Sequence, residues 1–198
     1  MQLNADDGGQ RKFILVQIPE ATPEGSEARK AGYETIAEIG KERIRRAGKK
    51  IQADKPDTQA DLGFKVFKLD TSNIKAWNPT PETLQDDLLN AVDNILADRT
   101  DEDLLYEVLI KYGLPLTLPV ETIQLGQHKG FSVGFGSLIA CFAQGITLET
   151  VQAIANLSTP ENPVLRVVFR DSSFKDDNVK TNAVQRLKQA GIEDVVSV

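Results

Sequence analysis

An α/β fold is predicted for this chain from three features of its sequence. Two short apolar segments with the composition of strands, 13–16 and 64–70, lie on either side of an amphipathic helical segment that begins at Thr35. Strand, helix and strand in this order form a βαβ unit, in which the two strands are expected to be parallel. A second series of short strands and helices follows the proline-rich stretch 78–81 and predicts a small α/β region with a mixed sheet.

The first half of the chain contains the expected βαβ unit. Residues 13–16 are continuously apolar, as in a strand buried on both faces, and Pro19 ends this strand just before Glu20. Thr35 and Glu38 form a capping-box pattern that opens a helix to about residue 50, while the second strand ends at Asp70. Five apolar residues are expected on the buried face of this helix: Ile36, Ile39, Ile44, Ala47 and Ile51.

The second half contains two linking helices and then the mixed sheet. The linking helices are expected over 83–97 and 101–112, and Thr100 is placed to cap the second. The remaining elements are strands near 121–125, 130–134, 138–142, 165–170 and 195–198, and helices over 147–157 and 178–190. We therefore expect two domains, 1–78 and 79–198.

Composition limits the possible functions. The 198 residues carry a net charge of −6, so the chain alone is expected to bind nucleic acid poorly. A single cysteine, Cys141, and a single histidine, His128, exclude an internal disulfide and a Cys/His zinc site, and they favour a reducing, cytoplasmic location. No apolar run approaches the roughly 20 residues of a membrane span, so no membrane partner is expected.

Four strings of residues, 1–20, 36–46, 63–77 and 166–177, closely resemble adenine-specific DNA methyltransferases of type III restriction–modification systems. The likeness extends over essentially the whole chain, in the right order. It implies that residues 1–78 form the C-terminal portion of a Rossmann-like S-adenosylmethionine-binding fold, which this chain contains in part. It also implies that residues 79–198 form a C-terminal α/β assembly domain.

Two carboxylates are candidate cofactor ligands. The resemblance places Glu20 where this family has the acid that binds the ribose of S-adenosylmethionine, and Asp70 where a carboxylate faces the adenine amino group of the same cofactor. Ligands of open parallel sheets do bind beyond the carboxyl ends of the strands. The alternative is that both residues are turn or helix-capping groups. We assign no catalytic residue and no metal ligand.

Two hallmark motifs of the family, Asp-Pro-Pro-Tyr and Phe-x-Gly-x-Gly, do not occur in the sequence. In the permuted order of the family, residue 1 would lie inside the helix after the cofactor loop. We therefore expect a part of the enzyme that is inactive alone and binds S-adenosylmethionine weakly or not at all. The string 133–136 resembles a glycine loop only superficially, and we interpret it as a tight hairpin or bulge.

The resemblance also implies partners: the remainder of the methyltransferase chain, a second copy in a homo-oligomer, and a restriction subunit with helicase and nuclease activities. DNA would be bound only through the complete enzyme. One alternative is a stand-alone α/β interaction module without catalysis, and another is a nuclease-like domain built on the charged cluster 170–177. A surface loop before a helix explains that cluster better, and a solvated face explains the basic residues 41–50 better than phosphate binding.

Overall fold

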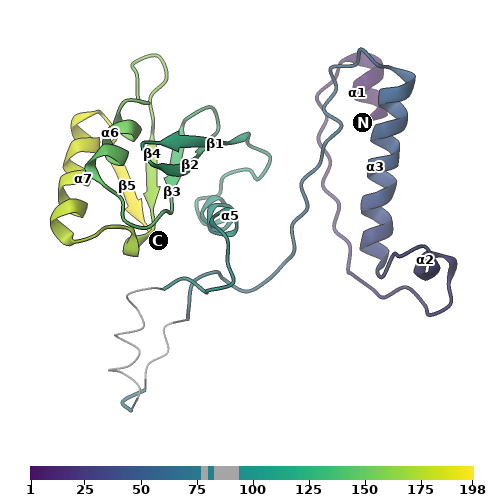
Figure 1. Cartoon of the computed structure of the whole chain (residues 1–198). Coiled ribbons are helices and arrows are strands. Elements are labelled where there is room, and N and C mark those ends of the chain that lie inside the picture. Colours follow the sequence, from purple (N-terminus) through teal and green to yellow (C-terminus); the bar gives the residue numbers. More distant parts are fainter. Residues whose placement is uncertain (77–79, 83–93) are drawn as a thin grey trace. The chain divides into compact units, whose positions relative to one another are not determined.

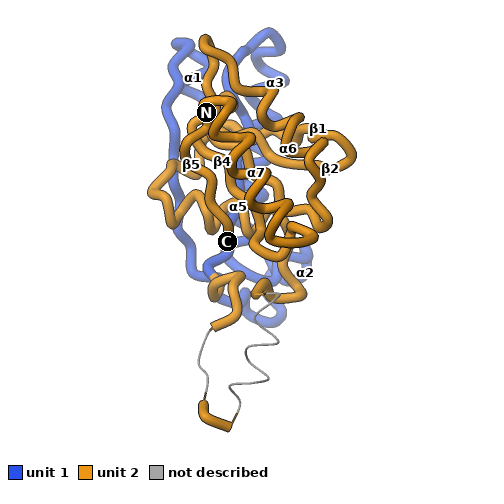
Figure 2. Tube along the Cα trace, turned by 90° about the vertical axis from the view of Figure 1, so that its left-hand side faces the viewer, with its two compact units in different colours: residues 1–69 blue, residues 70–198 orange. Residues whose placement is uncertain are grey.

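In the computed structural model, which describes residues 1–76, 80–82 and 94–198, the chain forms two compact units. Unit 1 is Met1–Leu69 and unit 2 is Asp70–Val198 (Figure 2), whereas we expected a boundary at 78–79. The α/β class with a mixed sheet is confirmed (Figure 1). The expected helix 83–97 lies outside the described residues up to 93, and residues 94–97 are not helical.

Unit 1 contains three helices among its described residues: α1 (Gln2–Asp7), α2 (Glu27–Lys30) and α3 (Ile36–Asp54). The Thr35 half of the expected capping box of α3 is present, since the Oγ1 atom of Thr35 accepts a hydrogen bond from the backbone N–H of Glu38 at 3.3 Å, while the Glu38 side chain pairs with Lys41. Lys55 ties the end of α3 to α1, because its Nζ atom lies 2.7 Å from a carboxylate oxygen of Asp6. The single turn α2, capped by Ser26, was not expected.

The two segments expected as strands of a βαβ unit are extended but not paired as strands. Among the described residues of unit 1, neither 13–16 nor 64–69 belongs to a β-strand, and both run along α3 (Figure 1). Their apolar side chains are exposed except for the partly buried Phe64, and Val16 is 93% exposed. A strand is stabilised by its neighbours more than by its own composition. A composition rich in strand-forming residues therefore did not by itself produce paired strands here.

The buried face of α3 is narrower than its apolar pattern predicted. Ile51 and Gly48 are buried, but Ala47 is exposed and Ile36 is 39% exposed. A Cβ atom placed on Gly48 would lie 3.4 Å from the carbonyl oxygen of Leu62, so the following extended segment packs against the helix at this glycine.

Unit 2 is built on a five-stranded sheet whose strands follow one another in chain order. β1, β2 and β3 are antiparallel, while β3, β4 and β5 are parallel, which confirms the expected mixed sheet. The strands are β1 (Val120–Leu125), β2 (His128–Val133), β3 (Leu138–Cys141), β4 (Arg166–Phe169) and β5 (Asp194–Ser197).

Helices cover both faces of this sheet. Helix α5 (Asp101–Lys111) packs on one face, and α6 (Leu148–Ala155) and α7 (Asp177–Gln189) pack on the other (Figure 1). Successive residues of β3 point to opposite faces, so Ile139 lies in the core under α6 and α7 while Ala140 lies in the core under α5. Burial on both faces explains why β3 is apolar throughout and why β4 is apolar after Arg166.

Two loops of unit 2 match their expected interpretations. The turn between β2 and β3 has positive φ angles of 60°, 60° and 91° at residues 134, 135 and 136, so it is a tight hairpin connection. The charged cluster 170–177 forms a short 3-10 turn, Asp171–Ser173, followed by the Asp176 cap of α7. Within the described part of the chain, no group of three or more acidic, His or Cys residues is placed to hold a metal ion.

No helix among the described residues is both long enough and apolar enough to cross a membrane.

Candidate functional site

Glu20 lies where the first extended segment of unit 1 meets the start of α3. Its carbonyl oxygen accepts a hydrogen bond from the N–H of Ile36 at 2.9 Å, and an antiparallel bridge joins Ala21 to Thr35. The residue itself is exposed. The backbone at Glu20 is therefore fixed to the amino end of α3, while its carboxylate is open to solvent.

Asp70 is the first residue of unit 2 and is held by two residues, Arg99 and Thr71. Its Oδ2 atom lies 2.9 Å from the Nη1 atom of Arg99, and its Oδ1 atom accepts the backbone N–H of Thr71 at 2.7 Å. The Arg99 guanidinium, followed by the Thr71 amide, holds the pKa of Asp70 below its ordinary value. Asp70 is thus a persistent anion whose side chain remains 57% exposed.

Each carboxylate oxygen can accept two hydrogen bonds, so the two partners of Asp70 leave acceptor capacity unused. An amino or hydroxyl group of a ligand can therefore reach Asp70 without displacing Arg99. Glu20 and Asp70 lie in different units, and their shared role at one cofactor remains a prediction.

Sequence reasoning missed the residue that organises the chain after Asp70. Glu107, on α5, accepts hydrogen bonds from the Ser72 hydroxyl at 2.6 Å and from the Asn73 backbone N–H at 2.7 Å. It also pairs with Lys111 at 2.8 Å. Burial alone would raise the pKa of Glu107, but the hydrogen bonds from Lys111, Ser72 and Asn73 outweigh burial and lower it to about 2.

Only one of these contacts has a sequence signal, the Glu–Lys spacing of four residues along a helix. The other partners of Glu107 lie 34 or 35 residues away in the chain. No local pattern could have connected them.

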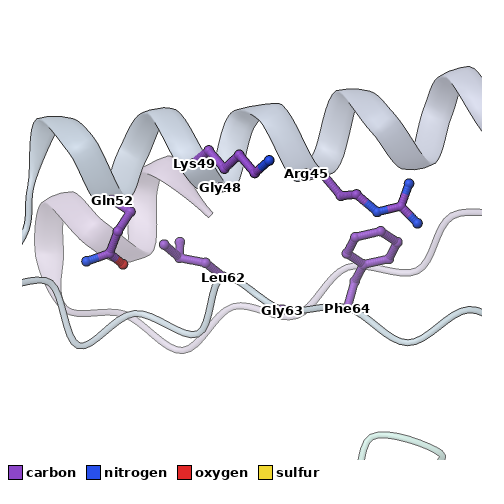
Figure 3. Close-up of a pocket in the computed structure, with 7 residues that line it drawn as sticks. All are labelled: Arg45, Gly48, Lys49, Gln52, Leu62, Gly63 and Phe64. Carbon is purple, nitrogen blue, oxygen red and sulfur yellow. The ribbon is translucent and has the colours of Figure 1, made fainter.

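A shallow groove of about 460 Å³ lies between α3 and the second extended segment of unit 1 (Figure 3). The guanidinium of Arg45 lies 5.9 Å from the centre of the Phe64 ring, and Lys49 lines the same groove. Elsewhere on α3, Lys41 pairs with Glu38 and Arg46 pairs with Glu42, as expected for a solvated face. The groove is too open to define a ligand by itself.

Comparison with known proteins gives three curated relatives, although no family model matches the chain. The chain is 49% identical over 86 residues, 43% of its length, to the StyLTI Mod subunit of Salmonella typhimurium, a type III restriction-modification enzyme, and this match covers 12% of that subunit.

Two further matches extend over 87% of the chain, each at 30% identity. They are the type III Mod subunits EcoP15I of Escherichia coli, over 176 residues, and EcoPI of Escherichia phage P1, over 180 residues. The chain covers 25% and 26% of these two relatives, so it spans about a quarter or less of the curated relatives that it matches. The resemblance found in the sequence is confirmed: the chain is homologous to part of the Mod subunits of type III restriction-modification enzymes.

Proposed function

We propose that this chain forms part of a site-specific adenine-N6 DNA methyltransferase of a type III restriction–modification system. The complete enzyme would transfer a methyl group from S-adenosylmethionine to adenine in DNA. The observation that carries the proposal is the similarity to Mod subunits over 87% of the chain.

The structure of unit 1 supports a role as part of a larger sheet. The segments 13–18 and 64–69 are extended, and most of their apolar side chains are exposed, which is unusual for a protein surface. Strands of a parallel sheet are apolar because helices and neighbouring strands cover them. We infer that the remainder of the Mod polypeptide supplies the strands that pair with these two segments.

The two predicted cofactor ligands follow these segments directly. Glu20 would accept hydrogen bonds from the ribose hydroxyls, and Asp70 would accept one from the adenine amino group of S-adenosylmethionine. Both carboxylates are exposed, and Asp70 is held as an anion by Arg99, which fits a donor ligand. The cofactor, when bound, supplies the methyl group.

The chain alone is expected to be inactive. The target adenine must leave the duplex to be methylated, and a dedicated site must hold it. In this family the Asp-Pro-Pro-Tyr motif performs that task, and the motif does not occur in this sequence. Cofactor binding by the chain alone should accordingly be weak or absent.

A chimera tests the proposal. The chain would replace the matching residues of the EcoP15I Mod subunit, and methyl transfer to DNA would be measured with labelled S-adenosylmethionine. We expect activity in the chimera, strongly reduced activity in its Glu20→Gln and Asp70→Asn variants, and unchanged activity in Glu24→Gln, an exposed carboxylate four residues after Glu20.

Two results would count against the proposal. One is robust methyl transfer by the 198-residue chain alone. The other is an active chimera in which Glu20→Gln and Asp70→Asn leave both the KM for S-adenosylmethionine and kcat unchanged.

The proposed partners follow from the family resemblance of the sequence. They are the rest of the Mod polypeptide, a second Mod copy and the restriction subunit, with DNA bound through the complete enzyme in the cytoplasm. Light scattering of the chain at high concentration tests self-association, and a strict monomer would remove the second copy as a partner of this region.

The competing function is a stand-alone α/β interaction module, and the observation that favours it is the well-packed core of unit 2. A module of this kind would bind a partner without any cofactor. In the chimera, it would allow assembly with the restriction subunit while Glu20→Gln and Asp70→Asn had no effect.

A further inference from the structure

The segment after Asp70 is fastened to α5 by one carboxylate. Both oxygens of Glu107 are used: Oε1 accepts from the Ser72 hydroxyl and pairs with Lys111, and Oε2 accepts from the backbone N–H and the side-chain amide of Asn73. The Asn73 amide also donates to the carbonyl oxygen of Asp103 at 3.0 Å. Residues 72 and 73 are therefore fixed on α5 at both backbone and side chain.

The same segment is fixed a second time by backbone pairing. The N–H of Lys75 donates to the carbonyl oxygen of Asn94 at 2.7 Å, and the N–H of Leu96 donates to that of Asn73 at 2.9 Å. Three residues after Leu96, the chain reaches Arg99, the partner of Asp70. Asp70 and Arg99 thus face each other at one end of a short antiparallel pairing that Glu107 anchors to α5.

The side chain of Asp70 is more exposed than the side chains of Arg99 and Glu107, which support it. The side chain of Asp70 is 57% exposed, whereas those of Arg99 and Glu107 are 17% and 15% exposed. An exposed carboxylate is free to meet a ligand, while the two nearly buried groups contact protein atoms. This is the arrangement of a ligand-facing group on a preorganised support.

We propose that Glu107 is a positioning residue for Asp70: by holding Ser72 and Asn73 on α5, it keeps the Asp70 carboxylate against Arg99 and oriented towards a ligand amino group. The inference rests on the proposed function, in which Asp70 contacts the adenine of the cofactor. It adds that unit 2 supports the cofactor site through α5.

The physical reason is the cost of ordering a loop. Each backbone residue held in one conformation loses conformational entropy, and a ligand that had to order residues 70–73 itself would bind correspondingly more weakly. The contacts of Glu107 order this segment before the ligand binds, so the ligand does not have to order it. They are charge-assisted, which makes them stronger than contacts between neutral groups.

The alternative is that Glu107 merely stabilises unit 2. Both roles predict that Glu107→Gln lowers the melting temperature, so stability alone does not separate them. They differ at Asp70: only a positioning role changes the environment of the Asp70 carboxylate in the folded protein. Among the described residues, the charged groups that act on the Asp70–Arg99 pair are Asp98 and Asp103.

The experiment follows the carboxyl carbon of Asp70 by NMR during a pH titration of the 198-residue chain. In the unaltered protein, Asp70 should titrate below the ordinary aspartate range, because Arg99 is in place. Arg99→Gln gives the titration point of Asp70 without this partner. Glu107→Gln should move the midpoint upwards, towards that reference.

Glu102→Gln is the matched control, since Glu102 is an exposed carboxylate on the same helix. It should leave the Asp70 titration unchanged. A Glu107→Gln protein that is less stable yet has an unchanged Asp70 midpoint would overturn the positioning role.

A second readout separates this inference from the proposed function. In the chimera, Glu107→Gln should raise the KM for S-adenosylmethionine several-fold with little change in kcat, and Glu102→Gln should not. If Glu107→Gln moves the Asp70 midpoint while Asp70→Asn leaves the KM unchanged, the positioning of Asp70 stands and its role as a cofactor ligand fails.

Discussion

The two units of this protein differ in how they bury their hydrophobic side chains. Of the 24 buried hydrophobic residues among the described ones, only Ile51 lies in unit 1, and the rest form the core of unit 2. Conversely, ten of the 15 large exposed hydrophobic side chains lie in unit 1, mostly in the segments 13–18 and 64–69. Unit 2 is closed around its own core, whereas unit 1 presents a surface of the kind that other protein elements cover.

The net charge also differs between the two units. Unit 1 carries 13 Lys and Arg against 11 Asp and Glu, a net charge of +2, while unit 2 carries 10 against 18, a net charge of −8. The acidic balance of the whole chain therefore belongs to unit 2. Electrostatics therefore disfavours a polyanion such as DNA more strongly at unit 2 than at unit 1.

The largest effect should come from the core of unit 2. Leu105→Ala removes a fully buried side chain of α5 and should lower the free energy of unfolding by about 3 kcal/mol. Ile110→Ala, on the exposed side of the same helix, should cost less than about 0.5 kcal/mol. Urea unfolding followed by NMR signals of unit 2 measures both. Equal effects of the two changes would show that α5 does not pack as described.

Glu107 gives the next largest effect and a dependence on pH. Its folded pKa of about 2 lies below the ordinary 4.5, so the unfolded chain binds the proton more readily. The stabilisation should be complete above about pH 4.5 and should be lost as the pH falls towards 2.

At neutral pH, Glu107→Gln should cost about 2 kcal/mol, because the amide loses the charge and places an N–H against donor groups. The loss should shrink as the pH falls through the same range. Chemical unfolding at several pH values tests this, and a cost that is independent of pH between 5 and 2 would contradict the assignment.

Helix caps provide a smaller and paired test. Thr100→Ala breaks the capping box of α5 and should lower the stability of unit 2 by about 1 kcal/mol. Thr35→Ala removes the equivalent cap of α3 and should reduce helix content in unit 1 without shifting the unfolding of unit 2. Circular dichroism and the NMR signals of each unit separate the two outcomes. A shift of unit 2 by Thr35→Ala would mean that the units unfold together.

The features that could be predicted from the sequence are those that have a short local sequence pattern. The caps at Thr35 and Thr100 and the strands of unit 2 follow from short patterns that the structure confirms. Unit 2 agrees best because apolar strands and helices occur together in one chain region and can cover one another. The turn at 134–136 was predictable because two glycines flank Phe135.

The remaining features depend on partners distant in sequence. The segments 13–16 and 64–70 have the composition of strands, but a ladder also needs neighbours, and composition does not supply them. The apolar pattern of α3 likewise overestimated its buried face at Ala47. The support of Asp70 was missed because Arg99 and Glu107 lie 29 and more than 30 residues away from the groups that they hold.

The smallest effect is expected where composition suggested a buried strand. Val16→Thr should change the stability of the chain by less than about 0.5 kcal/mol, since Val16 is exposed and a hydroxyl there meets water. The same change at Val168, which is fully buried in β4, should cost about 1–3 kcal/mol because its hydroxyl is desolvated. Hydrogen exchange should likewise be fast at residues 13–18 and slow at 138–141. Equal costs of the two substitutions, with slow exchange at 13–18, would mean that unit 1 buries this segment in solution, and the contrast between the two units would then disappear.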